Sequence, residues 1–390
     1  MRVAGEWFFA DHTQAVCAML TDAGHQALFV GGCVRNALLG APVNDIDIAT
    51  DARPDRVMDL AAGARLKPVP TGIDHGTVTV VAGGLPHEVT TFRRDVETFG
   101  RHAVVAYAET AQEDAHRRDF TMNALYARPD GTVLDPLGGL PDLIARRVRF
   151  IDDADARIRE DYLRILRFFR FHAWYGDPEG GLDPQGLAAC AANSAGLETL
   201  SRERVGAELK KLLAAPDPGQ SVAAMEASGV LARALPGAAA RALPVLVHLE
   251  TGWGIAPDPI RRLAALGGQD HADRLRLSKA EARKLDHLRA AMGSDEGPAV
   301  LGYRIGAAQA LDAVLLRAAL MEMPPPADAR DAIARGAMAT FPVKPRDLMP
   351  ALSGPALGAH LKRLEARWIV SGFALTRDAL LADTPRNGQE

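Results

Sequence analysis

A short segment near the N-terminus combines three groups that hold phosphate in proteins. An apolar run at residues 27–30 breaks at Gly31 and Gly32, which let the backbone approach a ligand and turn its N–H groups towards it. The residues that follow are typical of a helix, whose N-terminus favours phosphate oxygens. Arg35 lies in the first turn and can bind an anion with two parallel hydrogen bonds. Two glycines before a helix are most often a simple turn, so the next residues decide the interpretation.

Two carboxylates follow, at Asp45 and Asp47, and they alternate with Ile46 and Ile48. In a strand, residues two apart point to the same face, so the carboxylates project together while the isoleucines enter the core. Adjacent carboxylates repel each other unless a cation neutralises them, and Mg²⁺ that holds a triphosphate is the usual solution in nucleotidyl transfer. Glu88, on an expected neighbouring strand, is a candidate third carboxylate. The alternative is an amphipathic strand with an acidic face towards solvent.

A second polar cluster lies in residues 116–126, HRRDFTMNALY. Arg118 can hold phosphate or ribose oxygens, and Asn123 offers an amide that both donates and accepts hydrogen bonds. Taken alone, the segment is also typical of a helix start, with Asp119 or Thr121 near the cap.

A third cluster suits recognition of a base. On one helix, Asp161 and Arg164 are three residues apart and therefore neighbours, an acceptor beside a donor. The Watson–Crick edges of cytosine and adenine each present an amino donor next to a ring-nitrogen acceptor, whereas guanine and uracil present the reverse. The pair is therefore predicted to accept C and A and to reject G and U, because an unpaired buried polar group costs about 1–3 kcal/mol. An ordinary salt bridge on a solvated helix is the alternative.

Two further arginines continue the same helix at steps of three residues. Arg167 stays near the pair, while Arg170 turns away and can meet phosphate or another domain.

The elements that position these residues change character near residue 150. Up to that point, short β-type runs are separated by Gly, Pro and Asp clusters, and residues 77–92 are typical of a hairpin. From residue 152 onward the apolar spacing is almost wholly helical. The sequence therefore predicts an α+β fold: a mixed-sheet domain over residues 1–150, a helical segment over 151–215 and a further helical part over 216–390.

The composition is that of an ordinary globular protein, with 48% hydrophobic and 24% charged residues. A net charge of −4 does not exclude nucleic-acid binding, because a local basic surface is sufficient. The three cysteines have no metal-ligand spacing and indicate a reducing compartment. Because no apolar run resembles a signal peptide or a membrane span, we expect a cytoplasmic protein without a membrane partner.

Taken together and in order, these segments resemble the class II tRNA nucleotidyltransferase (CCA-adding enzyme) and bacterial poly(A) polymerase family, within the polymerase-β-like nucleotidyltransferase superfamily. The resemblance spans roughly residues 28–171 and continues in residues 201–213. Its matching blocks are GGCVRNALLG, NDIDIAT, EVTTFR, EDAHRRDFTMNALY, LDPLGGLPDL, REDYLRILRFFRF and SRERVGAELKKLL.

The resemblance implies a catalytic head, a neck that reads the base, and a body and tail that bind tRNA. Asp45 and Asp47 would bind Mg²⁺. The triphosphate, sugar and base of the nucleotide would be contacted by residues of the glycine turn and of the arginine-rich segments: Gly31, Gly32, Arg35, Arg118, Asp161, Arg164, Arg167 and Arg170.

One position departs from the family pattern, which usually has aspartate where this chain has Asn36. Asparagine keeps the hydrogen-bonding geometry but loses a charge, so no metal role is assigned to it. Residues 63–80 lack the basic signature typical of poly(A) polymerases. Residues 93–114 supply a full-length loop, which CC-adding enzymes tend to lack in part.

The sequence thus predicts an Mg²⁺-dependent enzyme that adds or repairs the 3′-terminal CCA of tRNA from CTP and ATP without a nucleic-acid template. The nearest alternative is a poly(A) polymerase or a partial CC- or A-adding enzyme. A different class, a non-catalytic RNA-binding protein on the same scaffold, is the second alternative.

Overall fold

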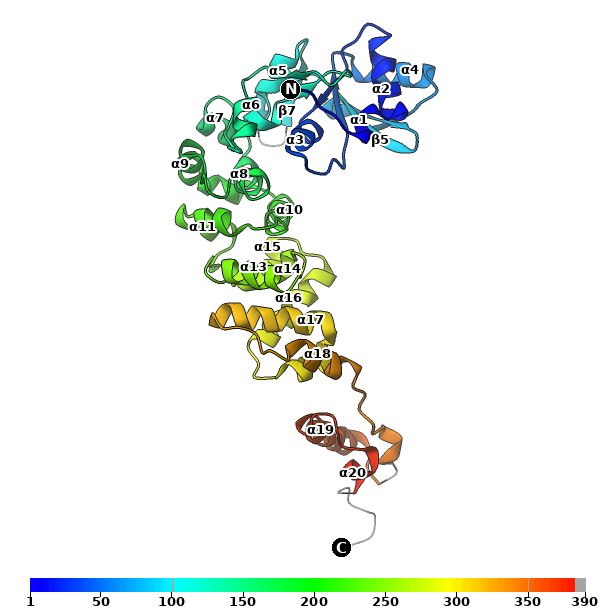
Figure 1. Ribbon diagram of the computed structural model, residues 1–390, viewed down its shortest axis with the longest axis vertical. Helices are drawn as coiled ribbons and strands as arrows, with labels where there is room; N and C mark the ends of the chain where they lie inside the picture. The colour runs from blue at the N-terminus through cyan, green and yellow to red at the C-terminus, as the bar shows by residue number, and fades with distance from the viewer. Residues whose placement is uncertain (100–101, 350, 383–390) are drawn as a thin grey trace. The chain divides into compact units, whose positions relative to one another are not determined.

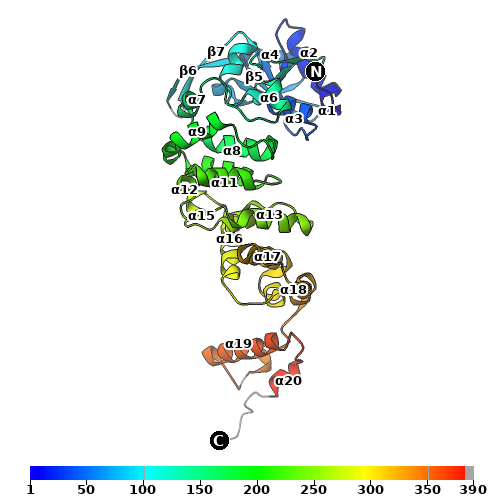
Figure 2. The same cartoon turned by 60° about the vertical axis from the view of Figure 1, so that its left-hand side comes forward.

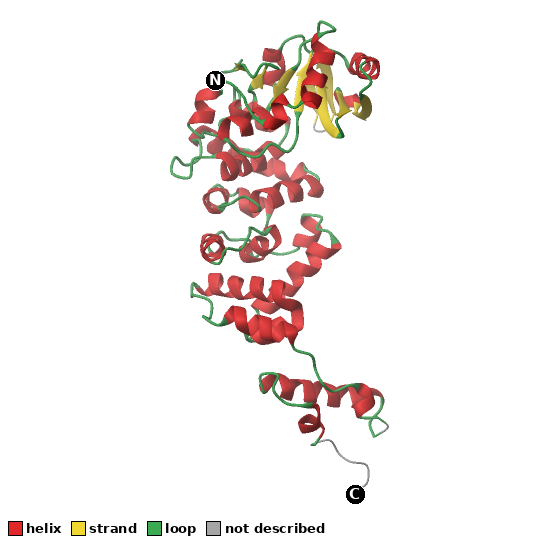
Figure 3. Cartoon of the chain, turned by 45° about the vertical axis from the view of Figure 1, so that its right-hand side comes forward, coloured by secondary structure: helices red, strands yellow, loops and turns green. Residues whose placement is uncertain are grey.

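The computed structural model describes residues 1–99, 102–349 and 351–382 of the chain. The chain divides into two compact units, residues 1–236 and 237–390. All described strands lie in the first unit, and the second unit is built from helices (Figures 1 and 3). The predicted α+β class, a head with a mixed sheet followed by helices, is confirmed.

A mixed sheet forms the centre of the first unit. Its strands lie in the order β3-β4-β5-β2-β1-β8-β9, and every neighbouring pair is antiparallel except β2 and β5, which run parallel. A separate small sheet pairs β6 with β7. The strands are β1 Leu28–Val30, β2 Asp47–Thr50, β3 Lys67–Gly72, β4 Thr77–Ala82, β5 Leu85–Thr91, β6 Arg93–Phe99, β7 His102–Tyr107, β8 Tyr126–Ala127 and β9 Val133–Leu134.

The predicted hairpin over residues 77–92 is present as β4 and β5. Ala82 pairs with Leu85, so the connection is a two-residue turn made of Gly83 and Gly84. Their φ angles of +59° and +80° suit a turn that follows the twist of the two strands. The predicted loop over residues 93–114 contains β6 and β7, and its residues 100–101 lie outside the described part of the chain.

Two helices of the first unit, α2 and α4, pack against each other and against β4 and β5. In α2, Val16, Cys17 and Leu20 are buried, which is the spacing of one helical face. The 3₁₀ turns here are η1 Ile73–His75 and η2 Thr121–Asn123, and the helices are α1 Glu6–Phe9, α2 Asp11–Thr21, α3 Gly32–Leu39, α4 Pro54–Gly63, α5 Ala111–His116 and α6 Leu140–Ile144.

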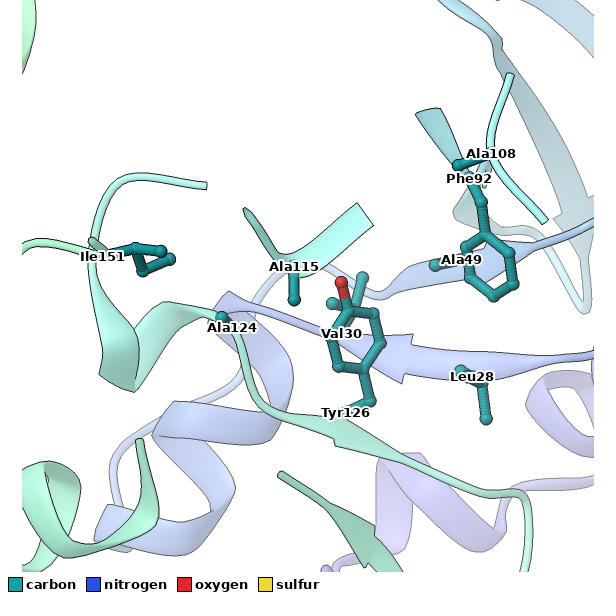
Figure 4. Close-up of a cluster of buried hydrophobic side chains, with 9 residues drawn as sticks. All are labelled: Leu28, Val30, Ala49, Phe92, Ala108, Ala115, Ala124, Tyr126 and Ile151. Carbon is teal, nitrogen blue, oxygen red and sulfur yellow. The ribbon is translucent and has the colours of Figure 1, made fainter. Parts of the chain in front are cut away.

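A buried apolar cluster fixes β1, the strand that leads into the glycine turn (Figure 4). Leu28 and Val30 of β1 contribute to it together with Phe92 and Tyr126. Tyr126 is completely buried, and its hydroxyl donates a hydrogen bond to Asp114 at 2.7 Å. The polar end of this ring is therefore satisfied inside the core.

The remaining helices of the first unit come after the sheet in the chain, and α8 packs against α10 (Figure 1) and α11 (Figure 2). Phe168 and Phe171 of α8 lie against Phe120, with ring centroids 6.3 and 4.8 Å apart. This aromatic contact attaches α8 to the segment that carries Arg118. The elements are α7 Ala154–Glu160, α8 Leu163–Tyr175, α9 Pro184–Ala192, η3 Ser194–Thr199, α10 Arg202–Leu213, α11 Gly219–Ala227 and α12 Val230–Ala234.

A buried ionic network lies in the core of the second unit. Glu250 is 1% exposed and accepts hydrogen bonds from both Arg261 and Arg262, while Arg261 also donates to Asp312 at 2.7 Å. The elements of this unit are α13 Ala242–Gly252, α14 Pro259–Leu266, α15 His271–Arg274, α16 Lys279–Met292, α17 Pro298–Met321, α18 Ala329–Met338, η4 Pro345–Asp347, α19 Gly354–Val370 and α20 Arg377–Leu381.

One helix of the described chain, α17, is long and apolar enough to cross a membrane by length and composition alone. It packs against α13, α14, α16 and α18, and its Asp312 takes part in the buried ionic network. Its backbone is also kinked at Gly306, whose φ is +77°. These contacts are those of a core helix.

Candidate active site

The glycine turn and Arg118 meet at the end of β1. Gly31 has a φ of +69°, which favours glycine, and its N–H donates to the carbonyl of Leu125 at 3.2 Å. A Cβ on Gly31 would lie 3.2 Å from Nη1 of Arg118. Gly32 begins α3, whose first N–H groups have no partner within the helix. The turn therefore brings backbone donors and a guanidinium to one place, as an anion site requires.

The candidate carboxylates lie at the start of β2 and on β5. Because β2 and β5 are parallel and Asp47 is in register with Glu88, these two side chains are neighbours on one face of the sheet. Since β2 begins at Asp47, the prediction that both aspartates lie within one strand is wrong for Asp45. Asp45 lies in the preceding loop, two residues before β2 begins, although the carbonyl of Ile46 still accepts a hydrogen bond from the N–H of Glu88 at 2.9 Å.

The charges around Asp47 show that these groups converge. Burial raises the pKa of Asp47 to about 6, and the negative charges of Glu88 and Asp45 act in the same direction. The positive charges of Arg118 and Arg35 act in the opposite direction. A bound cation would reduce the repulsion between Asp47 and the two carboxylates near it.

The donors present suit a hard divalent cation that is shared with a nucleotide. Mg²⁺ is usually bound through one or two carboxylates together with phosphate oxygens rather than by an all-protein cage. Asp45 and Asp47 would supply the two carboxylates. Within the described residues, no group of three or more His, Cys, Asp or Glu side chains is arranged to hold a metal.

Arg118 is held by a buried partner. Its Nη2 donates to Asp114 at 3.0 Å and its Nε to the Tyr126 hydroxyl at 3.2 Å. Burial alone would raise the pKa of Asp114, but Arg118, Arg117 and the Tyr126 hydroxyl bring that pKa well below its usual value. Asp114 is therefore ionised, and it fixes the guanidinium beside the glycine turn.

Arg35 occupies a less exposed position than a surface phosphate ligand. It is 5% exposed, and burial lowers the pKa of its guanidinium. Nη1 donates to Asn123 at 2.8 Å, and Nη2 donates to the Tyr175 hydroxyl at 2.9 Å. The guanidinium also lies 4.0 Å from the centre of the Tyr175 ring. Arg35 thus connects α3 to α8 as well as contributing positive charge beneath the site.

The structure gives Asn36 a specific role. Its Oδ1 accepts hydrogen bonds from Nε and Nη2 of Arg35 at 3.2 and 2.9 Å, and its Nδ2 donates to the carbonyl of Pro42 at 2.8 Å. An aspartate could make the first contacts but has no N–H for the last one. Asn36 therefore holds the loop that leads into Asp45.

Asp161 and Arg164 are close in space but are not neighbours on one helix, so that part of the prediction is wrong. Asp161 has an extended backbone with φ −154° and ψ 105°, and α8 begins only at Leu163. The carbonyl of Asp161 accepts a hydrogen bond from the N–H of Arg164 at 3.0 Å, and its Oδ1 accepts from the N–H of Leu163 at 3.1 Å. The carboxylate thus accepts from the backbone just ahead of it instead of lying on a helix surface, and the N-cap position of α8 is Tyr162.

Each member of this pair has its own ionic partner, and neither partner was predicted. Oδ2 of Asp161 accepts from Nη2 of Arg204 on α10 at 2.6 Å. Arg164 pairs with Glu160, and its Nη2 donates to the carbonyl of Arg117 at 3.1 Å. Arg204 lies in a block that carries the family resemblance, but nothing in its local sequence indicates a contact with a residue so far away in the chain.

The other two arginines of α8 point to different partners. Nε of Arg167 donates to Asp119 at 2.7 Å, and Asp119 in turn accepts from Nδ2 of Asn123 at 3.1 Å. Through Asn123 this chain of hydrogen bonds reaches Arg35. Arg170 instead pairs with Glu208 of α10 at 2.5 Å.

Comparisons with known proteins agree with this geometry. Residues 27–149 match the model of the poly A polymerase head domain, and residues 181–241 match the model described as the probable RNA and SrmB-binding site of polymerase A. The fold is therefore that of a nucleotidyltransferase head, followed by a segment similar to the probable RNA-binding site of polymerase A.

The chain belongs to the CCA-adding enzyme (CCA tRNA nucleotidyltransferase) family, and the predicted resemblance is confirmed. It is 32% identical over 397 residues to the mitochondrial CCA tRNA nucleotidyltransferase 1 of Homo sapiens, covering 96% of this chain and 90% of the relative. It is 36% identical over 328 residues to the CCA-adding enzyme of Geobacillus thermodenitrificans, covering 79% of this chain and 78% of the relative. The crystal structure of the Bacillus stearothermophilus CCA-adding enzyme in complex with CTP is similar, with a TM-score of 0.71, 28% identity and 93% coverage of each chain.

Proposed function

We propose that this protein adds or repairs the 3′-terminal CCA of tRNA, using CTP and ATP and depending on Mg²⁺. One observation carries the proposal: in a member of the CCA-adding family, the register of β2 and β5 sets Asp47 beside Glu88, with Arg118 close enough to act on the charge of Asp47. A triphosphate, a metal and an attacking hydroxyl have complementary groups there.

In this proposal the 3′-hydroxyl of the RNA attacks the α-phosphorus of the nucleotide. A bond forms between that oxygen and phosphorus, and the bond to the β-phosphate oxygen breaks, releasing pyrophosphate. Glu88 lies beside Asp47 and accepts the hydroxyl proton. Asp45 and Asp47 are the residues that would hold Mg²⁺, which would supply neutralising charge to the phosphates. The backbone N–H groups at Gly31 and Gly32 and the guanidinium of Arg118 bind and orient the triphosphate.

Base selection is assigned to Asp161 and Arg164. The carboxylate oxygens of Asp161 each accept one hydrogen bond from the protein, so each keeps a lone pair for an amino group of C or A. Among its described contacts, Arg164 uses Nη1 twice and Nη2 once, which leaves Nε–H and one Nη2–H for a ring nitrogen. Arg167, held by Asp119, and Arg170, held by Glu208, are also assigned to the nucleotide site.

The three-part organisation remains a proposal. Residues 1–150 would form the catalytic head, 151–215 the base-reading neck, and 216–390 a body and tail that bind tRNA. A cytoplasmic location is proposed on the same resemblance.

The decisive experiment offers the purified protein a tRNA that lacks CCA, together with labelled CTP and ATP. The wild type should add C, C and A, whereas the Asp45→Ala/Asp47→Ala variant should add nothing and still bind the tRNA. Long ATP-only tails would favour a poly(A) polymerase, and addition that stops at CC would indicate a partial enzyme. A complete lack of product at every Mg²⁺ concentration would favour a non-catalytic RNA-binding protein, and full activity of the double variant would remove the metal assignment.

A further inference from the structure

The buried guanidinium of Arg35 is held by neutral groups alone. Its Nε and Nη2 donate to the side-chain oxygen of Asn36, its Nη1 donates to that of Asn123, and Nη2 also donates to the Tyr175 hydroxyl. In the described part of the chain, Arg35 forms no ion pair with a carboxylate. The other arginines of the site each form one: Arg118, Arg164, Arg167 and Arg170. Arg35 is therefore a positive charge, shielded from water, that the protein does not neutralise.

The carboxylate of Asp119 acts on Arg35 only from behind an asparagine. Oδ1 of Asn123 accepts from Arg35 at 2.8 Å, while its Nδ2 donates to Asp119 at 3.1 Å. Asp119 is itself paired with Arg167 at 2.5 Å. Its negative charge is thus already shared with another cation.

The charge of Arg35 lies beside the turn that is proposed to bind the triphosphate. A Cβ placed on Gly32, the first residue of α3, would lie 3.8 Å from Nη2 of Arg35. Nη1 carries a second N–H, which has no partner among the described residues. A triphosphate at the glycine turn would therefore supply the negative charge that the protein does not.

Tyr175, the last residue of α8, holds this guanidinium in two ways. Its hydroxyl accepts a hydrogen bond from Nη2 at 2.9 Å, and the centre of its ring lies 4.0 Å from Cζ of Arg35. Phe171, one helical turn earlier, adds a second ring whose centre is 5.0 Å from Cζ. Burial lowers the pKa of Arg35, and the interaction with Tyr175 acts in the opposite direction. An aromatic face stabilises a cation through its quadrupole and, unlike a carboxylate, adds no negative charge.

We infer that Tyr175 is a positioning residue, which holds Arg35 at the glycine turn and leaves its positive charge to act on the triphosphate. The inference rests on the proposed function, because that function places the triphosphate at Gly31 and Gly32. Asn36 contributes to the same arrangement, since an aspartate there would set a negative charge against Arg35. Tyr175 acts only through Arg35 and contacts no part of the nucleotide.

The test measures the affinities of the full chain for CTP and CMP by titration calorimetry with Mg²⁺ and without RNA, so that no turnover occurs. CMP has the same base and sugar but lacks the two outer phosphates. Tyr175→Leu removes both the hydroxyl and the ring. It should weaken binding of CTP about tenfold, the low end for one hydrogen bond to a charged group, because Asn36 and Asn123 still hold Arg35. The affinity for CMP should change by less than about twofold.

A conservative variant and a double variant show whether the effect passes through Arg35. Tyr175→Phe keeps the ring and loses only the hydroxyl, so it should recover most of the lost affinity for CTP. In an Arg35→Gln background, Tyr175→Leu should not change the ratio of the CTP and CMP affinities further, because the guanidinium is absent.

Trp253→Leu is the matched control. It also removes an aromatic ring from an arginine, Arg330, whose Cζ lies 4.9 Å from the ring centre in the second unit, and it should leave both affinities unchanged. Thermal melting shows whether each variant is folded. Should Tyr175→Leu not fold, Tyr175→Phe carries the test through a loss of about two- to threefold for CTP, the low end for one hydrogen bond, with none for CMP.

The outcomes separate this inference from the proposed function. Equal losses of CTP and CMP affinity would show that Tyr175 supports the base-reading part of α8 instead of Arg35, and unchanged CTP affinity in folded Tyr175→Leu would show that Arg35 does not depend on it. A further fall of the affinity ratio in the Arg35→Gln background would show that Tyr175 acts by another route. Each of these results overturns the inference. A wild type that binds CTP with the predicted dependence on Tyr175 but adds no nucleotide to tRNA refutes the proposed function and leaves the role of Tyr175 standing.

Discussion

Arg204 offers the sharpest test of base reading, because it orients Asp161 without belonging to the predicted set. The carboxylate of Asp161 is held by two hydrogen bonds, from Nη2 of Arg204 at 2.6 Å and from the N–H of Leu163 at 3.1 Å. We predict that Arg204→Ala leaves Oδ1 of Asp161 bound to the N–H of Leu163 but removes the partner of Oδ2. The carboxylate then rotates more freely, and selection of C and A over G and U weakens.

The size of this effect follows from the exposure of the pair. A hydrogen bond between charged groups contributes about 1.5–3 kcal/mol when it is well shielded. The side chains of Arg204 and Asp161 are 32% and 28% exposed, so solvent screening reduces the contribution to about 1 kcal/mol. Because 1.4 kcal/mol corresponds to a tenfold change, we expect kcat/KM for CTP and ATP to fall about fivefold, and their preference over UTP and GTP to narrow by a similar factor.

The assay measures single-nucleotide incorporation into tRNA with each of the four nucleotides. Arg233→Ala is the matched control, because Arg233 also forms an arginine–carboxylate pair in the first unit, with Glu198 at 2.7 Å, and that pair lies on the surface. In an Asp161→Asn background, removal of Arg204 should change the rates less than twofold, since the carboxylate it orients is absent.

Two results would refute this reasoning. An Arg204→Ala variant with unchanged discrimination would show that Asp161 needs no orientation from α10. Improved use of CTP and ATP would show that Arg204 competes with the base instead of positioning the carboxylate.

Three further predictions concern other parts of the molecule. Asn36→Asp loses the N–H that donates to the loop before Asp45. One hydrogen bond contributes about 1 kcal/mol, so kcat should fall about fivefold. A single-turnover rate equal to that of the wild type would contradict this prediction. Glu250→Gln removes the carboxylate that two buried arginines share, so the free energy of unfolding of the second unit, measured in urea, should decrease by about 3 kcal/mol. The control Glu322→Gln, at an exposed ion pair, should change that free energy by less than about 0.5 kcal/mol. Burial and the charge of Arg289 lower the pKa of His271 to about 4, whereas the unfolded histidine titrates near 6.5. The free energy of unfolding should therefore decrease as the pH is lowered from 6.5 to 4, by up to about 1.4 kcal/mol per pH unit. His271→Asn should flatten that dependence.

Much of the site was predictable because it depends on local chemistry. Gly31 was identified by its place between an apolar run and a helix, and the structure gives it a φ that other residues rarely adopt. The sequence indicated that Asp47 and Glu88 lie on neighbouring strands. It did not indicate that these two residues are paired in register, since β2 and β5 are separated in the chain by other elements.

Elsewhere, helical periodicity was a poor guide. It placed Asp161 and Arg164 on one helix, but Asp161 adopts an extended backbone between α7 and α8, and its carboxylate accepts from the N–H of Leu163. A side chain that bonds to the backbone N–H groups ahead of it competes with helix formation at its own position.

By itself, then, the sequence determined which residue types were available, the strand and helix patterns, and the family. Only the tertiary structure decided which cation meets which carboxylate. Arg204 reaches Asp161, Arg167 reaches Asp119, and Arg170 reaches Glu208, across separations of 38 to 48 residues in the chain. An arginine side chain is long and can pair with any carboxylate that packing brings within about 3 Å. Its partner is therefore set by how α8 packs against α10 and against the segment that carries Asp119, rather than by local spacing.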